Sequence, residues 1–184
     1  LLEEIFPEAT IGRFDKDSTS TETKLKATLK AVNDKKIDIL VGTQMVAKGH
    51  DYHNVGLVVA LGIDYILHIP DYRSREKALS LLIQLCGRVG RKGEGKVAIS
   101  TYNSSFFERY LSHYDQFLED EAIYRKGLYP PFQRLALLKI EDKDEKKGEQ
   151  KTEKLAHSLV NIPNFEVVGW GKAPLEKLSG KWRF

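Results

Sequence analysis

The sequence predicts an α/β protein in which a parallel sheet, covered by helices on both faces, is followed by a partial small α+β domain. Three apolar, β-branched runs, residues 37–43, 55–61 and 95–101, are typical of strands buried on both faces of a sheet. Segments with helical spacing separate these runs, and strands that alternate with helices favour parallel pairing. The stretch GLYPPF, residues 127–132, is predicted to be a domain boundary, because it has paired prolines after an aromatic residue.

The first domain is expected over residues 1–122. A short strand is predicted over residues 9–14, followed by a polar turn at residues 15–21 that is also suited to capping a helix. A helix is predicted over residues 21–32, where apolar side chains recur with helical spacing. Further amphipathic helices are predicted over residues 74–87 and 104–127, the second with aromatic residues on its buried side.

The second domain is expected over residues 123–184. A strand is predicted over residues 134–141, a charged turn and a helix over residues 142–160, and another strand over residues 165–170. This β-α-β unit fits the first half of a small α+β domain. The Lys- and Glu-rich run at residues 142–154 is most simply a solvated face.

The composition narrows the class of protein. A chain of 184 residues that is 41% hydrophobic suits one or two domains with real cores, and no apolar run is long enough to span a membrane or resembles a secretory leader. The single cysteine, Cys86, excludes an internal disulfide and fits a reducing cytoplasm; we expect it to pack as a small apolar residue rather than to react. Residues 1–122 hold 16 Lys and Arg against 18 Asp and Glu, and residues 123–184 hold 13 against 8. The second domain therefore carries the positive charge that suits a polyanion.

The stretch QLCGRVGR closes the helix predicted over residues 74–87 with two arginines, Arg88 and Arg91. Because they are three residues apart, both side chains project to one side if the helical turn persists. A planar guanidinium matches phosphate oxygens, and Gly87 and Gly90 let the backbone approach a bulky anion. Gln84, one turn earlier on the same face, adds a neutral hydrogen-bonding group. The alternative is a pair of surface arginines at the negative end of the helix dipole.

A second polar loop, GTQMVAKGHD at residues 42–51, follows a buried strand, where α/β proteins bind ligands. Thr43 offers a hydroxyl to a phosphate, Asp51 can accept from a ribose hydroxyl, and Gly49 permits close approach. The alternative is a polar loop that only closes the strand. His50, Asp51 and His53 are dense in potential metal ligands, but the ligand set is incomplete and no metal site is predicted. A third polar loop, PDYRSRE at residues 70–76, opens the helix that follows it.

Two expected parts of a nucleotide site are missing from the sequence. No G-x-x-x-x-G-K-[ST] loop occurs, and no DExx carboxylate set follows a strand to hold Mg²⁺. The chain thus has candidate arginine fingers without a phosphate cradle. The opening LLEEIFPEAT has no Met and the closing LSGKWRF stops without a further element, so we expect both ends to be cuts within a longer protein.

The two loops resemble motifs V and VI of superfamily 2 helicases. LVGTQMVAKGHD and QLCGRVGR carry this resemblance. Longer stretches are similar to the bacterial replication-restart helicases, and the match covers nearly all of the chain; they include PDYRSREKALSLLIQLCGRVGRKGEGKVAISTYN, YRKGLYPPFQRLALLKI and KAPLEKLSGKWRF. Tyr52 and Tyr72 stand where phenylalanine is common in that family, and Lys77 takes the place of a usual arginine.

The resemblance implies a RecA-like second motor lobe and the start of a C-terminal domain of an ATP-dependent 3′-to-5′ DNA helicase that acts at stalled or branched replication forks. ATP and Mg²⁺ would be held mainly by a first lobe absent from this chain, and a zinc module is expected upstream of Leu1. Arg88 and Arg91 would stabilise charge on the γ-phosphate, and Gln84 would orient the phosphate or the attacking water. The remaining implied contacts are Gly49 and Asp51 with the nucleotide, Thr43 and Gln44 with the DNA backbone, and Lys48 between the two.

The implied partners are forked or single-stranded DNA, primosome proteins and single-strand-binding proteins, in the bacterial cytoplasm at the nucleoid and not at a membrane. Candidate phosphate contacts in the second domain are Lys172, Lys177, Lys181 and Arg183. Trp170 and Trp182 are candidates for stacking on DNA, with packing in the core as the alternative. Two other functions stay open, another superfamily 2 DNA translocase and a nucleic-acid-binding module without turnover. The chain alone is expected to hydrolyse no ATP.

Overall fold

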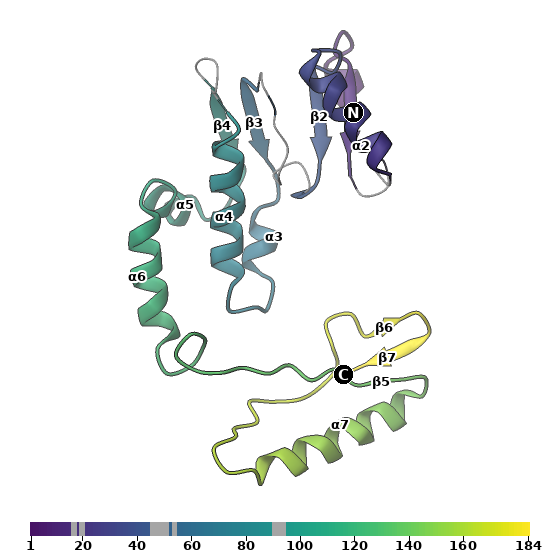
Figure 1. The fold of residues 1–184 in the computed structure, drawn as a ribbon, viewed down its shortest axis with the longest axis vertical. Coiled ribbons are helices and arrows are strands. Elements are labelled where there is room, and N and C mark those ends of the chain that lie inside the picture. Colours follow the sequence, from purple (N-terminus) through teal and green to yellow (C-terminus); the bar gives the residue numbers. More distant parts are fainter. Residues whose placement is uncertain (16–17, 19–20, 45–51, 53–54, 90–94) are drawn as a thin grey trace. The chain divides into compact units, whose positions relative to one another are not determined.

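The computed structural model describes residues 1–15, 18, 21–44, 52, 55–89 and 95–184. These residues form two compact units, Leu1–Lys126 and Gly127–Phe184 (Figure 1). The first unit contains all of the parallel strands in the described part of the chain, and the second contains a small antiparallel sheet.

The four strands of the first unit follow the predicted runs. They are β1 (Ile11–Phe14), β2 (Ile39–Gly42), β3 (Leu57–Ala60) and β4 (Lys96–Ile99). Parallel pairing joins β1 to β2 and β3 to β4, so the described residues hydrogen-bond as two pairs of strands. The mixed α/β class with parallel strands and flanking helices is confirmed.

The helices of the first unit agree with the sequence in type, with one exception. α1 (Leu2–Ile5) and α3 (Asp64–Leu67) are single turns, while α2 (Glu22–Asn33) and α4 (Ser74–Cys86) match the predicted helices. The Thr21 hydroxyl accepts a hydrogen bond from the Lys24 amide at 3.3 Å, which makes Thr21 the N-cap of α2 as the polar turn indicated.

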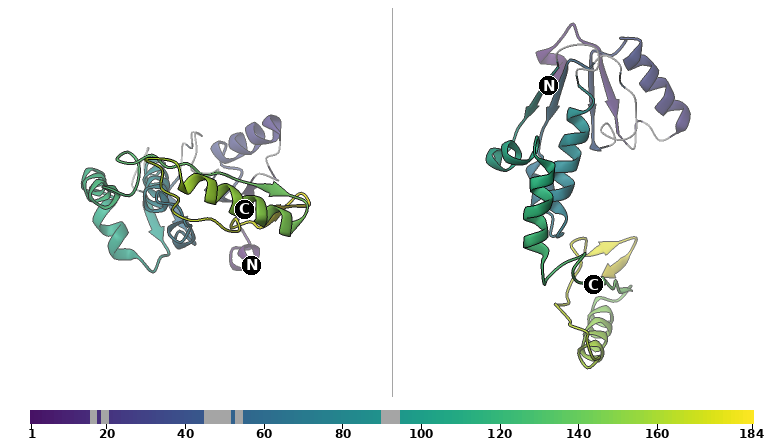
Figure 2. Two further views of the ribbon diagram at one scale, coloured as in Figure 1. Left: turned by 90° about the horizontal axis from the view of Figure 1, so that it is seen from below. Right: turned by 60° about the vertical axis from the view of Figure 1, so that its left-hand side comes forward.

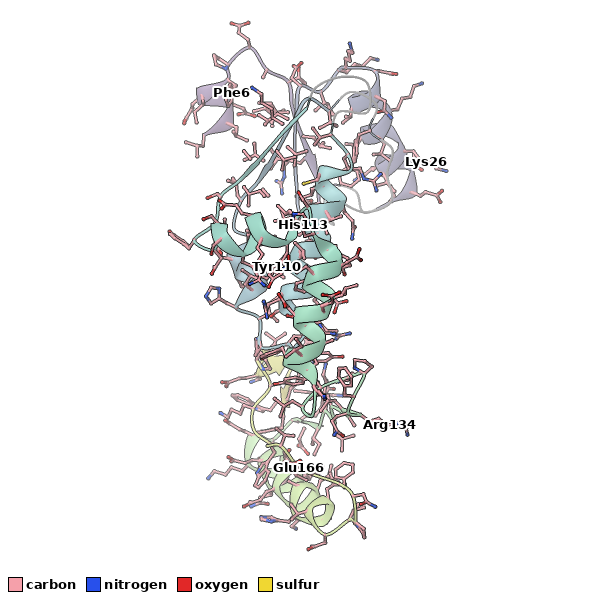
Figure 3. All side chains as sticks on the ribbon, turned by 90° about the vertical axis from the view of Figure 1, so that its left-hand side faces the viewer. Phe6, Lys26, Tyr110, His113, Arg134 and Glu166 are labelled. Atoms are coloured by element: carbon pink, nitrogen blue, oxygen red, sulfur yellow. The ribbon has the colours of Figure 1, made fainter. Side chains whose placement is uncertain are left out.

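A single helix over residues 104–127 is a wrong prediction. The structure has two helices instead, α5 (Ser104–Tyr110) and α6 (Tyr114–Arg125), and the turn between them lies at Tyr110 and His113 (Figure 3). The break lets aromatic rings from the two helices pack edge to face, with Tyr110 and Phe117 centroids 5.4 Å apart. Favourable packing of aromatic rings outweighs the local preference for one continuous helix.

The core of the first unit lies between α4 and the aromatic residues of α5 and α6. Leu79 and Leu82 of α4, together with Phe117, have no exposed surface, and Phe107 is 2% exposed. Two views of the ribbon show α4 and α6 as long neighbouring helices (Figure 2). Burial of this apolar face fixes α4, the helix that ends at the candidate arginines.

The second unit has an antiparallel sheet in the order β5-β7-β6. Its strands are β5 (Glu141–Asp142), β6 (Lys177–Leu178) and β7 (Lys181–Arg183), and its helix is α7 (Glu145–Val160). Ser179 and Gly180 join β6 to β7, both with positive φ (49° and 77°), which is typical of a type I′ hairpin turn. The helix prediction is confirmed, and the hairpin was not predicted.

Two predicted strands of the second unit are wrong in extent. Of residues 134–141, only Glu141 lies in a strand, and residues 165–170 contain none. Arg134 and Glu166 mark these two extended segments (Figure 3). Leu137 and Val168 are 81% and 85% exposed, and in the first run only Ile140 pairs with another segment, through two backbone hydrogen bonds with Phe184. Residues with a high strand propensity form a strand only where another segment hydrogen-bonds to their backbone.

Candidate nucleotide and nucleic-acid site

The helical turn persists through the first candidate arginine. The Gly87 amide donates to the Ile83 carbonyl at 2.9 Å, and the Arg88 amide donates to the Leu85 carbonyl at 3.0 Å. Gln84 is exposed and Arg88 half-buried, and their spacing places both on one face of α4. Gly87 is also exposed, which leaves the backbone open beside them. Gln84, Gly87 and Arg88 thus lie together at the carboxyl end of α4, and their role as an anion site stays a prediction.

A buried tyrosine lies close to Arg88. Tyr52 is 3% exposed, and its hydroxyl has no hydrogen-bond partner among the described residues. Burial raises the pKa of Tyr52, while the positive charge of Arg88 acts in the opposite direction. The charge of Arg88 therefore acts on the Tyr52 hydroxyl, and the two side chains lie in the same region of the first unit.

Thr43 and Gln44 lie at the opposite edge of the strands from the carboxyl end of α4. β2, β3 and β4 run in one direction in Figure 1, and Thr43 and Gln44 follow the carboxyl end of β2, where both are exposed. The carboxyl end of α4 precedes β4 and so lies at the amino edge. The strand-end rule alone therefore does not gather all of the described candidate residues in one place.

Several candidate residues lie outside the described part of the chain. They are Lys48, Gly49, Asp51, Gly90 and Arg91, and the histidines weighed as metal ligands, His50 and His53, lie there too. Their roles stay predictions. In the described residues, no group of three or more His, Cys, Asp or Glu side chains is arranged to hold a metal ion. None of the described helices has the length and apolar character that a membrane span needs.

The third polar loop, PDYRSRE, is held by ion pairs within the protein. Asp71 accepts from the Lys77 ammonium at 2.5 Å and from the Arg73 amide at 2.9 Å. Lys77, followed by Arg73, holds the pKa of Asp71 well below its usual range. The Arg73 guanidinium also lies over the Tyr72 ring, 5.3 Å from its centroid. These contacts give the loop a structural role at the amino end of α4.

A buried carboxylate on α6 completes this arrangement. Glu121 is 2% exposed, and its Oε1 lies 2.8 Å from Nη1 of Arg75, while its Oε2 lies 3.2 Å from Nη2 of Arg125. Arg125 Nη2 is also 2.8 Å from Oε2 of Glu76. We call Arg75, Glu76, Glu121 and Arg125 the α4–α6 clamp. The clamp ties the amino end of α4 to α6 and so fixes the helix that carries Gln84 and Arg88.

Sequence reasoning did not single out Glu121. It stands in the charged stretch FLEDEAIYR with two other acidic residues, and helical spacing alone does not tell which of the three is buried. The nearest available indication was the position of Phe117, four residues earlier on the same helical face.

Cys86 is half-buried, and burial raises the pKa of its thiol. A raised pKa keeps the thiol protonated and unreactive near neutral pH. This agrees with packing rather than with a reactive thiol.

The four basic candidates in the second unit fall into two groups. Lys172 Nζ lies 2.5 Å from Glu145 Oε1, while Lys181 and Arg183 both lie near Glu141, at 3.8 and 3.4 Å. Lys177 has no acidic partner among the described residues. Its ammonium lies over the Trp182 ring, 4.9 Å from the centroid. Among the four candidates, Lys177 is thus the one whose charge is not balanced by a carboxylate of the described residues.

The two tryptophans do not belong to the buried core. Trp170 is 53% exposed, and Trp182 is half-buried between the ammonium groups of Lys172 and Lys177. Trp170 also packs edge to face with His157, with ring centroids 5.6 Å apart.

Comparison of the sequence with known protein families identifies the class to which this fold belongs. Residues 2–93 match the model of the helicase conserved C-terminal domain, which spans the parallel strands β1–β3, α4 and the QLCGRVGR turn. The chain belongs to this family.

Individual proteins with similar sequences define the relationship more narrowly than the family does. The chain is 41% identical to replication restart protein PriA of Helicobacter pylori (strain ATCC 700392 / 26695) over 190 residues, covering 100% of this chain and 30% of the relative. It is 37% identical to replication restart protein PriA of Bacillus subtilis (strain 168), covering 100% of this chain and 24% of the relative. The chain thus spans less than a third of the length of these relatives.

Proposed function

We propose that the complete gene product is an ATP-dependent 3′-to-5′ DNA helicase that acts at stalled or branched forks in replication restart, with this chain as its second motor lobe and the start of its C-terminal domain. The relatives' names, replication restart protein PriA, and the helicase family of residues 2–93 support this proposal. Forked or single-stranded DNA is the substrate, and primosome and single-strand-binding proteins are the partners, in the bacterial cytoplasm at the nucleoid.

One observation supports the catalytic assignment most directly. The charge of Arg88 acts on Tyr52, although 36 positions separate them in the sequence, so Tyr52, which follows the GTQMVAKGHD loop in the sequence, lies in the region of the carboxyl end of α4. Asp51 directly precedes Tyr52 in sequence. Nucleotide contacts from both motifs can therefore come from one edge of the lobe.

The described residues fit a nucleotide phosphate. Gln84, Gly87 and Arg88 offer an amide, an open backbone and a permanent cation on one exposed face. ATP supplies the free energy of γ-phosphate hydrolysis when bound. Arg88 stabilises negative charge at the phosphate, together with Arg91, and Gln84 orients a phosphate oxygen or a water. Mg²⁺ is held by carboxylates outside this chain, and a zinc module lies upstream in the gene product.

The nucleic acid contacts belong to the other edge and to the second unit. Thr43 and Gln44, exposed at the carboxyl end of β2, contact the backbone of the tracked strand, and Lys48 lies between this edge and the nucleotide. In the second unit, Lys177 is the best placed of the four basic candidates, because no carboxylate among the described residues competes for its charge. Lys172, Lys181 and Arg183 add phosphate contacts at the expense of their ion pairs.

The test replaces Arg88 by alanine in the complete gene product. DNA-stimulated ATP hydrolysis is expected to fall by roughly 10³- to 10⁵-fold, the usual contribution of an arginine finger, and Arg91→Ala is expected to do the same. Fork binding, measured by fluorescence anisotropy, stays largely in place because Arg88 lies at the nucleotide edge. The isolated chain is expected to show no turnover.

The matched control is Arg109→Ala. Arg109 is 54% exposed and pairs with Asp120 on the neighbouring helix, a surface ion pair that contributes little to stability. It should leave ATP hydrolysis within twofold of the wild type. Wild-type turnover in both the Arg88 and the Arg91 variants would show that the arginines only occupy the end of a helix.

A further inference from the structure

Two tyrosines stand exposed at the carboxyl ends of β3 and β4. Tyr102, three residues after β4, is 99% exposed, and Tyr65, five residues after β3, is 77% exposed. β3 and β4 are paired in parallel, so both segments leave the sheet at the same edge. None of the roles assigned above uses either ring.

Asp64 fixes these two segments to one another. Its Oδ1 accepts from the Thr101 hydroxyl at 2.8 Å and from the Asn103 amide nitrogen at 2.7 Å, and its Oδ2 accepts from the Tyr102 backbone amide at 3.1 Å. Tyr65 follows Asp64 directly. The backbone of each tyrosine is therefore held in place while its ring is open to solvent. These hydrogen bonds, with that of Asn103 first, also lower the pKa of Asp64, so the carboxylate stays charged and the contacts persist at neutral pH.

Polar side chains lie near the two rings in the sequence, together with Leu61, which follows β3 and is 77% exposed. His68 is exposed, and its Nδ1 lies 2.7 Å from the Asp64 carbonyl oxygen, which directs Nε2 away from that contact. Ser104 and Ser105, next in sequence after Asn103, are exposed as well. Exposed flat rings with hydrogen-bonding groups beside them suit a ligand that has a flat face and a polar edge.

This edge is also the edge of the proposed DNA contacts. Thr43 and Gln44 follow the carboxyl end of β2, which runs in the same direction as β3 and β4 (Figure 1). A strand whose phosphates meet Thr43 and Gln44 would present its bases along this edge.

We propose that Tyr65 and Tyr102 form a stacking site for unpaired nucleobases of the single strand that Thr43 and Gln44 contact. The inference rests on the proposed function and adds to it a base-binding element. Stacking on an aromatic ring is tolerant of sequence, because every base presents a flat face. The site thus suits a motor that must move along any sequence.

The experiment measures binding of a fluorescein-labelled oligothymidylate to the complete gene product by anisotropy. Tyr102→Ala, and separately Tyr65→Ala, should weaken binding by roughly 5- to 150-fold, the usual contribution of one stacked base. Tyr102→Phe should bind like the wild type because it keeps the ring. Ile123→Ala is the control, since Ile123 is 74% exposed on α6 and belongs to no proposed contact.

Two further measurements separate stacking from other causes of weaker binding. The dependence of log K on log salt concentration should keep its slope in Tyr102→Ala, whereas loss of a phosphate contact reduces the slope by about one. An oligonucleotide with abasic sites in place of its bases should bind the wild type and Tyr102→Ala with equal affinity, because neither complex has a base to stack.

The outcomes are distinct. Unchanged affinity of both alanine variants, or an equal loss on abasic DNA, overturns the stacking site and leaves the helicase proposal standing. A wild-type protein that binds no single-stranded DNA overturns the proposed function itself. A 2-aminopurine base that is quenched by the wild type and not by Tyr102→Leu supports the site independently of affinity.

Discussion

Replacing Glu121 by alanine tests the α4–α6 clamp directly. The change leaves Arg75 and Arg125 without the buried carboxylate that both contact. Removing one partner of a buried ion pair typically costs about 3–5 kcal/mol, because the remaining charge stays desolvated. The side chain of Arg75 is 37% exposed and can regain water, and Arg125 keeps Glu76, so we expect a loss near the lower end, about 3 kcal/mol.

The chain contains an internal control for this measurement. Both of its tryptophans, Trp170 and Trp182, lie in the second unit, so tryptophan fluorescence follows that unit, while circular dichroism at 222 nm follows both. In urea unfolding of the chain, Glu121→Ala should shift the transition seen only by circular dichroism and leave the fluorescence transition in place. In a thermal scan, the corresponding shift is roughly 6–12 °C.

Comparison variants isolate the cause. Glu119→Ala removes an exposed carboxylate from the same helix and should change the free energy of unfolding by less than about 0.5 kcal/mol. The double variant Glu121→Met with Arg125→Met should recover part of the loss, because it removes a buried charge together with its partner. A loss below about 1 kcal/mol in Glu121→Ala, or an equal shift of both transitions, would refute the clamp.

The other predictions concern Gly148 of α7 and Asp15 after β1. A Cβ at Gly148 would collide with the Phe184 ring, so Gly148→Ala should destabilise the second unit by about 1–3 kcal/mol despite the helix preference of alanine. Tryptophan fluorescence in urea measures this loss, and Gly169→Ala, with nothing near its Cβ position, should not show it. Wild-type stability of Gly148→Ala would contradict the packing. Asp15 accepts from the Ser18 amide at 2.7 Å, and this bond, with one from the neighbouring arginine, lowers its pKa from 3.8 to about 2. Because the pKa of Asp15 is lower in the folded than in the unfolded state, this stabilisation is complete above pH 3.8 and is lost as pH falls through about 2. Asp15→Asn should flatten that part of the stability–pH profile. An NMR titration that gives Asp15 an ordinary pKa would contradict this prediction.

The strands and most helices of the first unit were predictable because their signals are local. The apolar runs ending near Gly42, Ala60 and Ile99 are strands, and Thr21 caps α2 as its residue type favours. The break between α5 and α6 was not predictable from periodicity, since it depends on how Tyr110 and Phe117 pack.

In the second unit, local sequence signals predicted the strands poorly. Residues 134–140 and 165–170 have the composition of strands, yet a strand forms only where another segment hydrogen-bonds to it. The β6–β7 hairpin, in contrast, had a local signal in Ser179–Gly180, a dipeptide typical of tight turns.

By itself, the sequence determined the class of the fold, the position of most elements of the first unit, and the residue types of the candidate site, since periodicity and side-chain chemistry are properties of neighbouring residues. Only the tertiary structure decided that the charge of Arg88 acts on the buried Tyr52, that Glu121 is the buried acid of its helix, and that Lys181 but not Lys177 lies near a carboxylate. Each of these depends on contacts between segments distant in the chain. Such contacts are selected by the packing of the whole unit rather than by any local pattern.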